Sequence, residues 1–333
     1  MGSRPPRRLR GEHPSDEGDG TVKKAIGALV SLILLALIWW QVDLSSIRAA
    51  LAAADGWWLA AGLATIVPLT LVTAMRFGML TQTPIGLWSA TRLILGASSL
   101  NLVLPSKLGD LAKAVALTGR HGFDPKLAVG VVVMERSLDM AALLFWGVLA
   151  LLWVGWGDVW LMMAAAGTGA LLVLLVILLS PLRFASRFLA LAGRIAPGRI
   201  GRWLSGFGET WQQAVGWFWS DRRRVAKVAG VSLLIWGGHL AQFWLFAQGL
   251  GRVPFLDNMA FATLAILAGL LPFTMAGVGT RDAAIVLLYA PYLSAGSAAV
   301  LGVLATLRYL VPAIAGLPFM GDYLVQVRKE RAA

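Results

Sequence analysis

The stretch SSLNLVLPSKLGDLAK, residues 98–113, decides how this chain folds. It is a short apolar run that Pro105 and Gly109 interrupt, and charged residues follow immediately. A second stretch of this kind, GLLPFTMAGVGTRDAA, occupies residues 269–284 in the other half of the chain. Neither apolar run reaches the ~20 apolar residues that a helix needs to cross a bilayer. Interrupted segments at corresponding places in two halves predict the binding site of a transporter.

The composition of the 333-residue chain indicates a polytopic membrane protein. Hydrophobic residues make up 58% and charged residues only 14%, against about 25% charged residues in soluble domains. The net charge of +12 does not imply a nucleic-acid partner, because Lys and Arg collect in segments expected to face anionic lipid headgroups. The chain has no cysteine and three scattered histidines, so we expect no disulfide, no metal site and no cofactor.

Six apolar runs are long enough to cross the bilayer, at about 22–40, 57–79, 127–153, 159–180, 228–250 and 297–320. The interrupted segments lie between the second and third of these runs and between the fifth and sixth. We predict an all-α polytopic membrane protein with six full transmembrane helices and two re-entrant, broken-helix segments. Its membrane domain comprises residues 21–325, between a disordered cytoplasmic tail (1–20) and a second cytoplasmic tail (326–333).

The positions of Lys and Arg predict the orientation of the chain. We place the amino terminus in the cytoplasm and let each interrupted segment leave the membrane on the side from which it entered. Arg48 and Arg252 are then the only Lys or Arg residues in the outer loops. Both termini are then cytoplasmic. The halves 22–153 and 159–321 each contain an odd number of full spans. The second half is therefore inverted relative to the first, as in many transporters.

The basic stretch between the fourth and fifth spans is expected to contain a helix at about 199–219. Apolar residues recur in it at spacings of three and four: Trp203, Phe207, Trp211, Val215 and Phe218. One interpretation places this stripe in the headgroup layer, with Arg199 and Arg202 toward lipid phosphates. In the other, the helix packs on the protein's own cytoplasmic face. The sequence leaves both open.

The charged residues of the first interrupted segment are candidates for contact with a phosphate. A helix that begins near Ser106 would aim its amino end, Lys107 and Lys113 at one place. Asn101 is placed to satisfy backbone groups freed where the preceding helix stops. The alternative is a basic amphipathic helix at the cytoplasmic surface, which is the interpretation we prefer for Lys113. For Asp110, close to the break, we favour a structural or functional role.

The second interrupted segment combines glycines with adjacent opposite charges. Gly277 and Gly279 permit unusual backbone angles and the close approach of a ligand, although such a pair also forms simple tight turns. Thr280 is expected to cap a following half-helix. Arg281 and Asp282 then lie in its first turn, where Asp suits the helix dipole and Arg needs another partner.

Two of the predicted spans carry charges within the membrane. The third holds Glu135, Arg136 and Asp139 at helical spacing, and the sixth holds Arg308 near its middle. A central Arg costs about 2.5–3.5 kcal/mol on insertion scales, so Arg308 must face a partner or a watery cavity. We expect it to pair with Asp139 or Asp282, or to meet a lipid phosphate. The alternative is a purely structural ion pair.

Three motifs give the chain a resemblance to the lysylphosphatidylglycerol synthase transmembrane domain family, which is flippase-like. The first motif is similar to the family's N…P…GE…R segment and consists of Asn101, Pro105, Gly109, Asp110 and Lys113. The second resembles its ER…D motif and consists of Glu135, Arg136 and Asp139. The third resembles its P…G…G…RE segment and consists of Pro272, Gly277, Gly279, Arg281 and Asp282. Asp110 and Asp282 stand where Glu is usual and Lys113 where Arg is usual, which changes reach and phosphate geometry.

The resemblance implies movement of lipids between leaflets. We therefore predict translocation of a phospholipid, glycolipid or polyprenyl-linked lipid, with an anionic headgroup, across a bacterial inner membrane. Arg281, Arg308 and Lys107 would hold the headgroup phosphate near the midplane. In bifunctional family members, an aminoacyltransferase domain follows a comparable membrane region. That activity is not expected here, because the chain ends soon after the last span.

Two other functions are compatible with the sequence. One is a membrane-embedded enzyme that modifies a lipid headgroup, with Glu135 and Asp139 as an acid/base pair. The other is a noncatalytic partner of a cell-envelope synthase. The chain contains no nucleophile-elbow, HExxH or Walker-type motif. We therefore favour a transporter over an enzyme and expect passive exchange or ion coupling.

Overall fold

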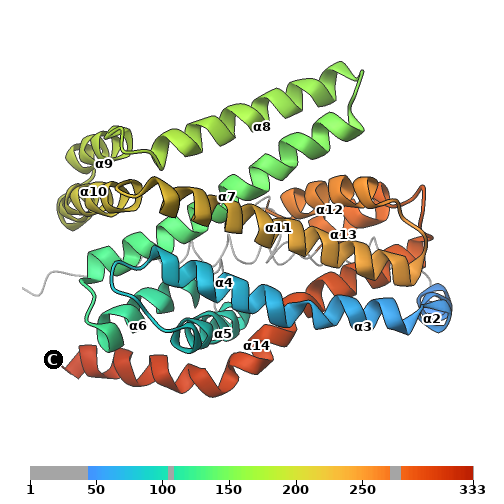
Figure 1. Ribbon diagram of the computed structural model, residues 1–333, viewed down its shortest axis with the longest axis horizontal. Coiled ribbons are helices and arrows are strands. Elements are labelled where there is room, and N and C mark those ends of the chain that lie inside the picture. The colour runs from blue at the N-terminus through green and yellow to red at the C-terminus, as the bar shows by residue number, and fades with distance from the viewer. Residues whose placement is uncertain (1–43, 104–108, 271–278, 333) are drawn as a thin grey trace, which may run out of the picture.

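The computed structural model describes residues 44–103, 109–270 and 279–332, and within these ranges it contains helices and no strand (Figure 1). The predicted first span and the residues Pro105, Lys107 and Gly277 lie outside the described residues. Among the described residues, five helical segments are long and apolar enough to cross a membrane: α3–α4 (Gly56–Leu80), α7 (Pro125–Val154), α8 (Val159–Leu178), α11 (Arg222–Leu250) and the part Ala295–Met320 of α14. They coincide with five predicted spans, which confirms an all-helical polytopic membrane protein.

Aspartates mark the beginnings of the long helices. Asp55, Asp124, Asp158 and Asp221 precede α3, α7, α8 and α11, and each carboxylate accepts a hydrogen bond from a backbone N–H of the first turn. Such caps satisfy N–H groups that have no partner inside the helix. They fix where each helix starts.

The span predicted at 57–79 consists of two helices, α3 (Gly56–Ala64) and α4 (Ile66–Leu80), which meet at Thr65. The hydroxyl of Thr65 donates to the carbonyl of Gly62 at 2.6 Å, a contact that bends helices. Pro68 also lacks the N–H that would bond to the carbonyl of Ala64. These two residues explain the break.

Each interrupted segment has a short helix on either side of its break. The first pair is α5 (Leu87–Val103) and α6 (Leu111–His121), and the second is α12 (Phe255–Gly269) and α13 (Thr280–Leu288). In Figure 1, α4 ends and α7 begins at the left, so α5 and α6 return to the end from which they start. The pair α12 and α13 also returns to the end from which it starts. That end is the opposite one, and the pair lies between α11 and α14 in the chain. Helix α14 packs against both α5 and α13.

Some boundaries differ from the prediction. Helix α14 (Ala295–Ala332) extends beyond the predicted last span at about 297–320. Two helices, α2 (Leu44–Ala53) and α9 (Phe184–Ile195), are not predicted at all. Both are short and lie outside the long apolar runs, so they carry no signal of a membrane span.

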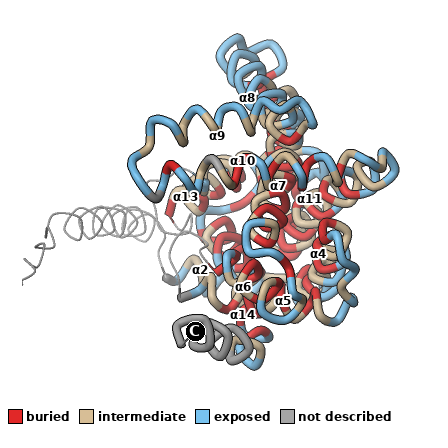
Figure 2. The backbone as a smooth tube through the Cα atoms, turned by 90° about the vertical axis from the view of Figure 1, so that its left-hand side faces the viewer, coloured by how far each residue is buried: buried red, intermediate tan, exposed pale blue. Residues whose placement is uncertain are grey.

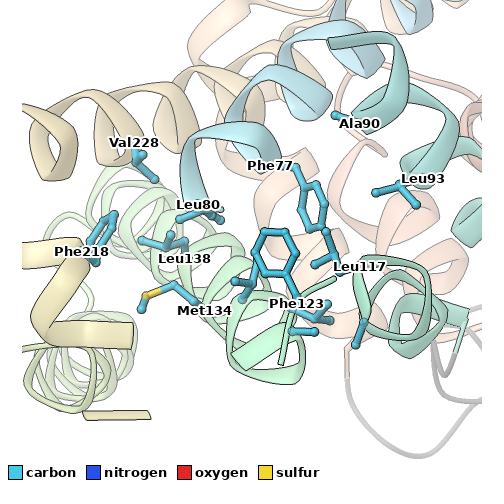
Figure 3. Close-up of a cluster of buried hydrophobic side chains, with 14 of the residues drawn as sticks. Phe77, Leu80, Ala90, Leu93, Leu117, Phe123, Met134, Leu138, Phe218 and Val228 are labelled. Atoms are coloured by element: carbon cyan, nitrogen blue, oxygen red, sulfur yellow. The ribbon is translucent and has the colours of Figure 1, made fainter. Parts of the chain in front are cut away.

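Two apolar clusters hold the helices together. The first joins α4, α5, α6, α7, α10 and α11, and Figure 3 shows members that include Phe77, Leu80, Leu117, Met134 and Phe218. The second joins α7, α11, α12, α13 and α14 and includes Phe243, Phe246, Ile285, Tyr289 and Leu301. By contrast, α8 and α9 are largely exposed (Figure 2). Apolar side chains exposed on α8 suit a helix that faces lipid.

The apolar stripe of α10 (Gly198–Trp219) faces the protein. Phe207, Trp211, Val215 and Phe218 are at most 7% exposed and belong to the first apolar cluster. Trp203 alone among the five is exposed, at 51%. Of the two interpretations that the sequence leaves open, the burial of these four side chains supports the one in which α10 packs on the protein's own face.

Candidate functional site

Six charged side chains from three helices form one ion-pair network. They are Arg76 of α4, Asp110 and Lys113 at the start of α6, and Glu135, Arg136 and Asp139 of α7. Five of them are predicted site residues, and Arg76 is not. The network adjoins the first apolar cluster, because the Lys113 ammonium lies 5.4 Å from the centre of the Phe77 ring.

Glu135 lies at the centre of the network and its side chain is fully buried. Its Oε2 accepts a hydrogen bond from Lys113 Nζ at 2.8 Å. Its Oε1 lies 3.1 Å from Arg136 Nη2 and 3.6 Å from Arg76 Nη2. One carboxylate thus binds cations from α4, α6 and α7.

Arg76 extends the network to a fourth helix. Its Nη1 donates to Asp139 Oδ1 at 2.5 Å and to Ser232 Oγ of α11 at 3.2 Å. Asp139 is also 3.3 Å from Arg136 Nη1, one helical turn away. The sequence offered one signal for Arg76, since it is a single charge within the apolar run of α4 and such a charge needs a buried partner.

Lys113 is 1% exposed, so the prediction that it lies on a surface helix is wrong. Besides Glu135, its Nζ pairs with Asp110 Oδ1 at 3.1 Å. Asn101 Nδ2, at the end of α5, donates to the same oxygen at 3.4 Å. Gly109 makes this approach possible, because a Cβ there would lie 2.6 Å from the Asn101 backbone nitrogen.

The network is balanced in charge. Three cations, Arg76, Lys113 and Arg136, face three carboxylates, Asp110, Glu135 and Asp139. Buried charges are tolerated when they are paired, and every member here has a partner. A balanced set has no positive charge left over for an anion, so its geometry is that of a structural clamp between α4, α6, α7 and α11.

A second charged group lies where α13 begins. Gly279, with φ at +103°, is the capping residue, so the prediction that Thr280 caps this helix is off by one position. Asp282 accepts the Gly279 N–H at 3.2 Å with Oδ2 and the Arg281 Nη2 at 2.7 Å with Oδ1. Arg281 Nη2 also donates to Thr306 Oγ1 of α14 at 2.8 Å. Arg281 and Asp282 thus neutralise each other and fix α13 to α14.

Arg308 of α14 is a buried cation with no carboxylate partner in the described part of the chain. It is 4% exposed, and its guanidinium donates to the Tyr309 hydroxyl and lies 4.9 Å from the centre of the Phe243 ring. Its Nε and Nη1 are buried and have no hydrogen-bond partner among the residues that the structure describes. The predicted pairing with Asp139 or Asp282 is wrong, because those carboxylates bind Arg76, Arg136 and Arg281 instead.

The predicted site residues therefore fall into two groups rather than one. The network touches α11 at Ser232, and Arg308 touches it at Phe243. These positions are eleven residues apart, which is about 16 Å along a helix. Among the described residues, no group of three or more His, Cys, Asp or Glu could hold a metal ion.

Comparison with known families supplies a further finding. The family model described as the lysylphosphatidylglycerol synthase TM region matches residues 24–316. This range contains both interrupted segments and every predicted site residue. The resemblance that the three motifs indicated is thereby confirmed. A search of curated proteins gave no match.

Proposed function

Because the chain belongs to the family of the lysylphosphatidylglycerol synthase TM region, we propose that it moves a lipid between the leaflets of a bacterial inner membrane. Membership of this family supports a lipid-related role in the cell envelope. The more specific proposal is that the lipid carries a phosphate in its headgroup. A phospholipid, a glycolipid linked through phosphate and a polyprenyl-linked lipid all meet this condition.

The observation that carries the proposal is the charge of Arg308. Among the described residues, Arg281 and Asp282 neutralise each other and the six-residue network is balanced, so Arg308 adds one net positive charge to the part of the interior that the structure describes. Leaving a buried charge unpaired is costly. A phosphate oxygen would neutralise the charge and accept hydrogen bonds from the two unpartnered nitrogens, since a guanidinium matches phosphate geometry. Arg308 is the phosphate ligand in this proposal.

The order of the helices supports alternating access to that ligand. A candidate span, a broken pair and a second candidate span occur twice, as α3–α4, α5–α6 and α7, and as α11, α12–α13 and α14. The chain enters and leaves one broken pair at one end of the molecule, and the other broken pair at the opposite end (Figure 1). This arrangement supports an inverted repeat with re-entrant segments, in which rocking of one half against the other exposes a central site to either leaflet.

The distribution of basic residues supports the orientation in the membrane. The end on the left of Figure 1 carries Arg120, Lys126, Arg222, Arg223 and Arg224 at its helix termini, as well as the arginines around α9. The opposite end carries Arg48 and Arg252. By the positive-inside rule, the left end is cytoplasmic in this proposal.

Replacement of Arg308 tests the proposal. Purified protein is reconstituted in liposomes with a fluorescent phospholipid, and a membrane-impermeant quencher reports movement between leaflets. We expect Arg308→Ala to slow this movement about tenfold or more, because a charge-assisted hydrogen bond is worth roughly 1.5–3 kcal/mol. Arg308→Lys keeps the charge but not the forked geometry and should give an intermediate rate.

A matched control for this experiment is Arg252→Ala. Arg252 is exposed between α11 and α12, and its replacement should leave the rate unchanged. A correctly inserted Arg308→Ala protein with the wild-type rate would remove Arg308 from the site. Mass spectrometry of the recovered lipid separates the alternatives, because a chemically altered headgroup would indicate an enzyme instead. The structure gives such an enzyme little support, since Glu135 and Asp139 are both held in ion pairs.

A further inference from the structure

Helix α9 presents an apolar face that no part of the described chain covers. None of its residues is buried. Phe184, Phe188, Leu191 and Ile195 are 51%, 61%, 56% and 79% exposed, and their spacings of four, three and four place them on one helical face. The helix packs along α10 at one end of the molecule and is exposed along its length (Figures 1 and 2).

An apolar groove lies between α9 and α10. Its volume is about 390 Å³, and it is lined by Phe188, Leu191, Ala192, Ile195, Ala196 and Leu204. All six side chains are apolar, so the groove offers no hydrogen bond to a polar ligand. Its size lies within the ~300–1,000 Å³ typical of small-molecule sites. A hydrocarbon chain is the ligand that this lining suits.

The segment that carries the groove is strongly basic. Residues 181–220 contain five arginines and a single acidic residue, Glu209. Arg183, Arg187, Arg194 and Arg202 are all exposed, and no ion pair with a carboxylate holds any of these four within the described residues. On the helical wheel, Arg187 and Arg194 lie beside the apolar face of α9. An apolar groove on a segment that also carries exposed arginines is complementary to an anionic amphiphile.

The position of α9 relative to the membrane identifies that amphiphile. The candidate span α8 ends at Leu178, and α9 begins six residues later at Phe184. So short a connection keeps α9 at the membrane surface, where an apolar face sinks among acyl chains and arginines meet anionic headgroups. We propose that an anionic phospholipid of the adjacent leaflet binds here, with an acyl chain in the α9–α10 groove and its headgroup at the arginines. This site is separate from Arg308 and does not depend on the proposed function.

Site-directed spin labelling tests the depth of α9, and the absence of native cysteine makes single-cysteine variants simple to prepare. A label at Leu191→Cys reports the apolar face, and one at Gln213→Cys, exposed on α10, is the matched control. In nanodiscs of phosphatidylcholine with phosphatidylglycerol, we expect the first label to be shielded from an aqueous relaxation agent and the second to be accessible. Equal accessibility of the two labels would overturn the proposal.

Lipid retention tests the groove and the arginines separately. Native mass spectrometry of the purified protein is carried out with added phosphatidylglycerol or phosphatidylcholine. We expect Ala192→Trp, which fills the groove, and the pair Arg187→Gln and Arg194→Gln each to lower phosphatidylglycerol retention several-fold. Ala190→Trp, on α9 but outside the groove lining, should not. Equal retention of the two lipids by the wild type, or unchanged phosphatidylglycerol retention in the groove and arginine variants, would refute the site whatever the transport assay shows.

Discussion

Replacing Glu135 with alanine is expected to lower the free energy of unfolding by about 3–5 kcal/mol. This is the usual cost of removing one partner of a buried ion pair, because the other charge stays buried without compensation. Glu135 is fully buried and contacts Lys113, Arg136 and Arg76. Without it, three cations face two carboxylates, and two of the cations, Arg76 and Lys113, are buried. At roughly 2 °C per kcal/mol, the midpoint of thermal unfolding in detergent should fall by about 6–10 °C.

Two further variants make this prediction specific. Glu209→Ala removes an exposed carboxylate on α10 and should leave the midpoint unchanged. Adding Lys113→Met to Glu135→Ala restores the charge balance with an apolar side chain of similar length. The double variant should therefore be more stable than the sum of the two single effects predicts. Strict additivity would mean that Lys113 and Glu135 do not depend on each other, contrary to the 2.8 Å contact between them.

The long helices could be predicted because their signal is local. A run of about 20 apolar residues needs no knowledge of its neighbours to be identified as a span. The break at Thr65 was missed because the apolar run continues through it, and only the backbone requirements of Pro68 reveal it. Helix α9 was missed because it is too short for a span.

The pairing of the buried charges could not be predicted from the sequence. Arg136 and Asp139 lie one turn apart on α7, so their contact follows from helical spacing. Arg76 and Asp139 are 63 positions apart, and no periodicity relates them. For the same reason, the partner of Arg308 was predicted wrongly, since the carboxylates that seemed free pair with other cations.

An amphipathic pattern does not say what the distinct face of a helix contacts, as α6 and α10 illustrate. Periodicity shows that one face of a helix differs from the other, but not whether that face meets lipid, water or protein. Lys113 seemed to face water and instead meets Glu135. The sequence leaves open whether the stripe of α10 faces headgroups or protein, and the stripe packs on the protein, including α7, whereas α9 presents the face that is left uncovered.

Replacing Gly316 with valine is expected to separate α14 from α5 and to destabilise the protein by about 3 kcal/mol or more. Gly316 is buried where these two helices cross, and a Cβ there would lie closer than 3.0 Å to the carbonyl group of Leu95 and to Ser99 Oγ. Backbone atoms cannot rotate away as a flexible side chain can, so the helices must move apart. Ser99 would then lose its 2.5 Å hydrogen bond to the Ala313 carbonyl.

The same substitution at Gly167 of α8 is the control, because nothing lies within 4 Å of a Cβ built there. Gly167→Val changes helix propensity by the same amount but blocks no contact, so its thermal midpoint should stay near that of the wild type. Gly316→Val should also disturb the ion-pair network, since α5 carries Asn101, which binds Asp110. A Gly316→Val protein that unfolds at the same temperature as Gly167→Val would show that α5 and α14 are not in the close contact that small residues allow between membrane helices.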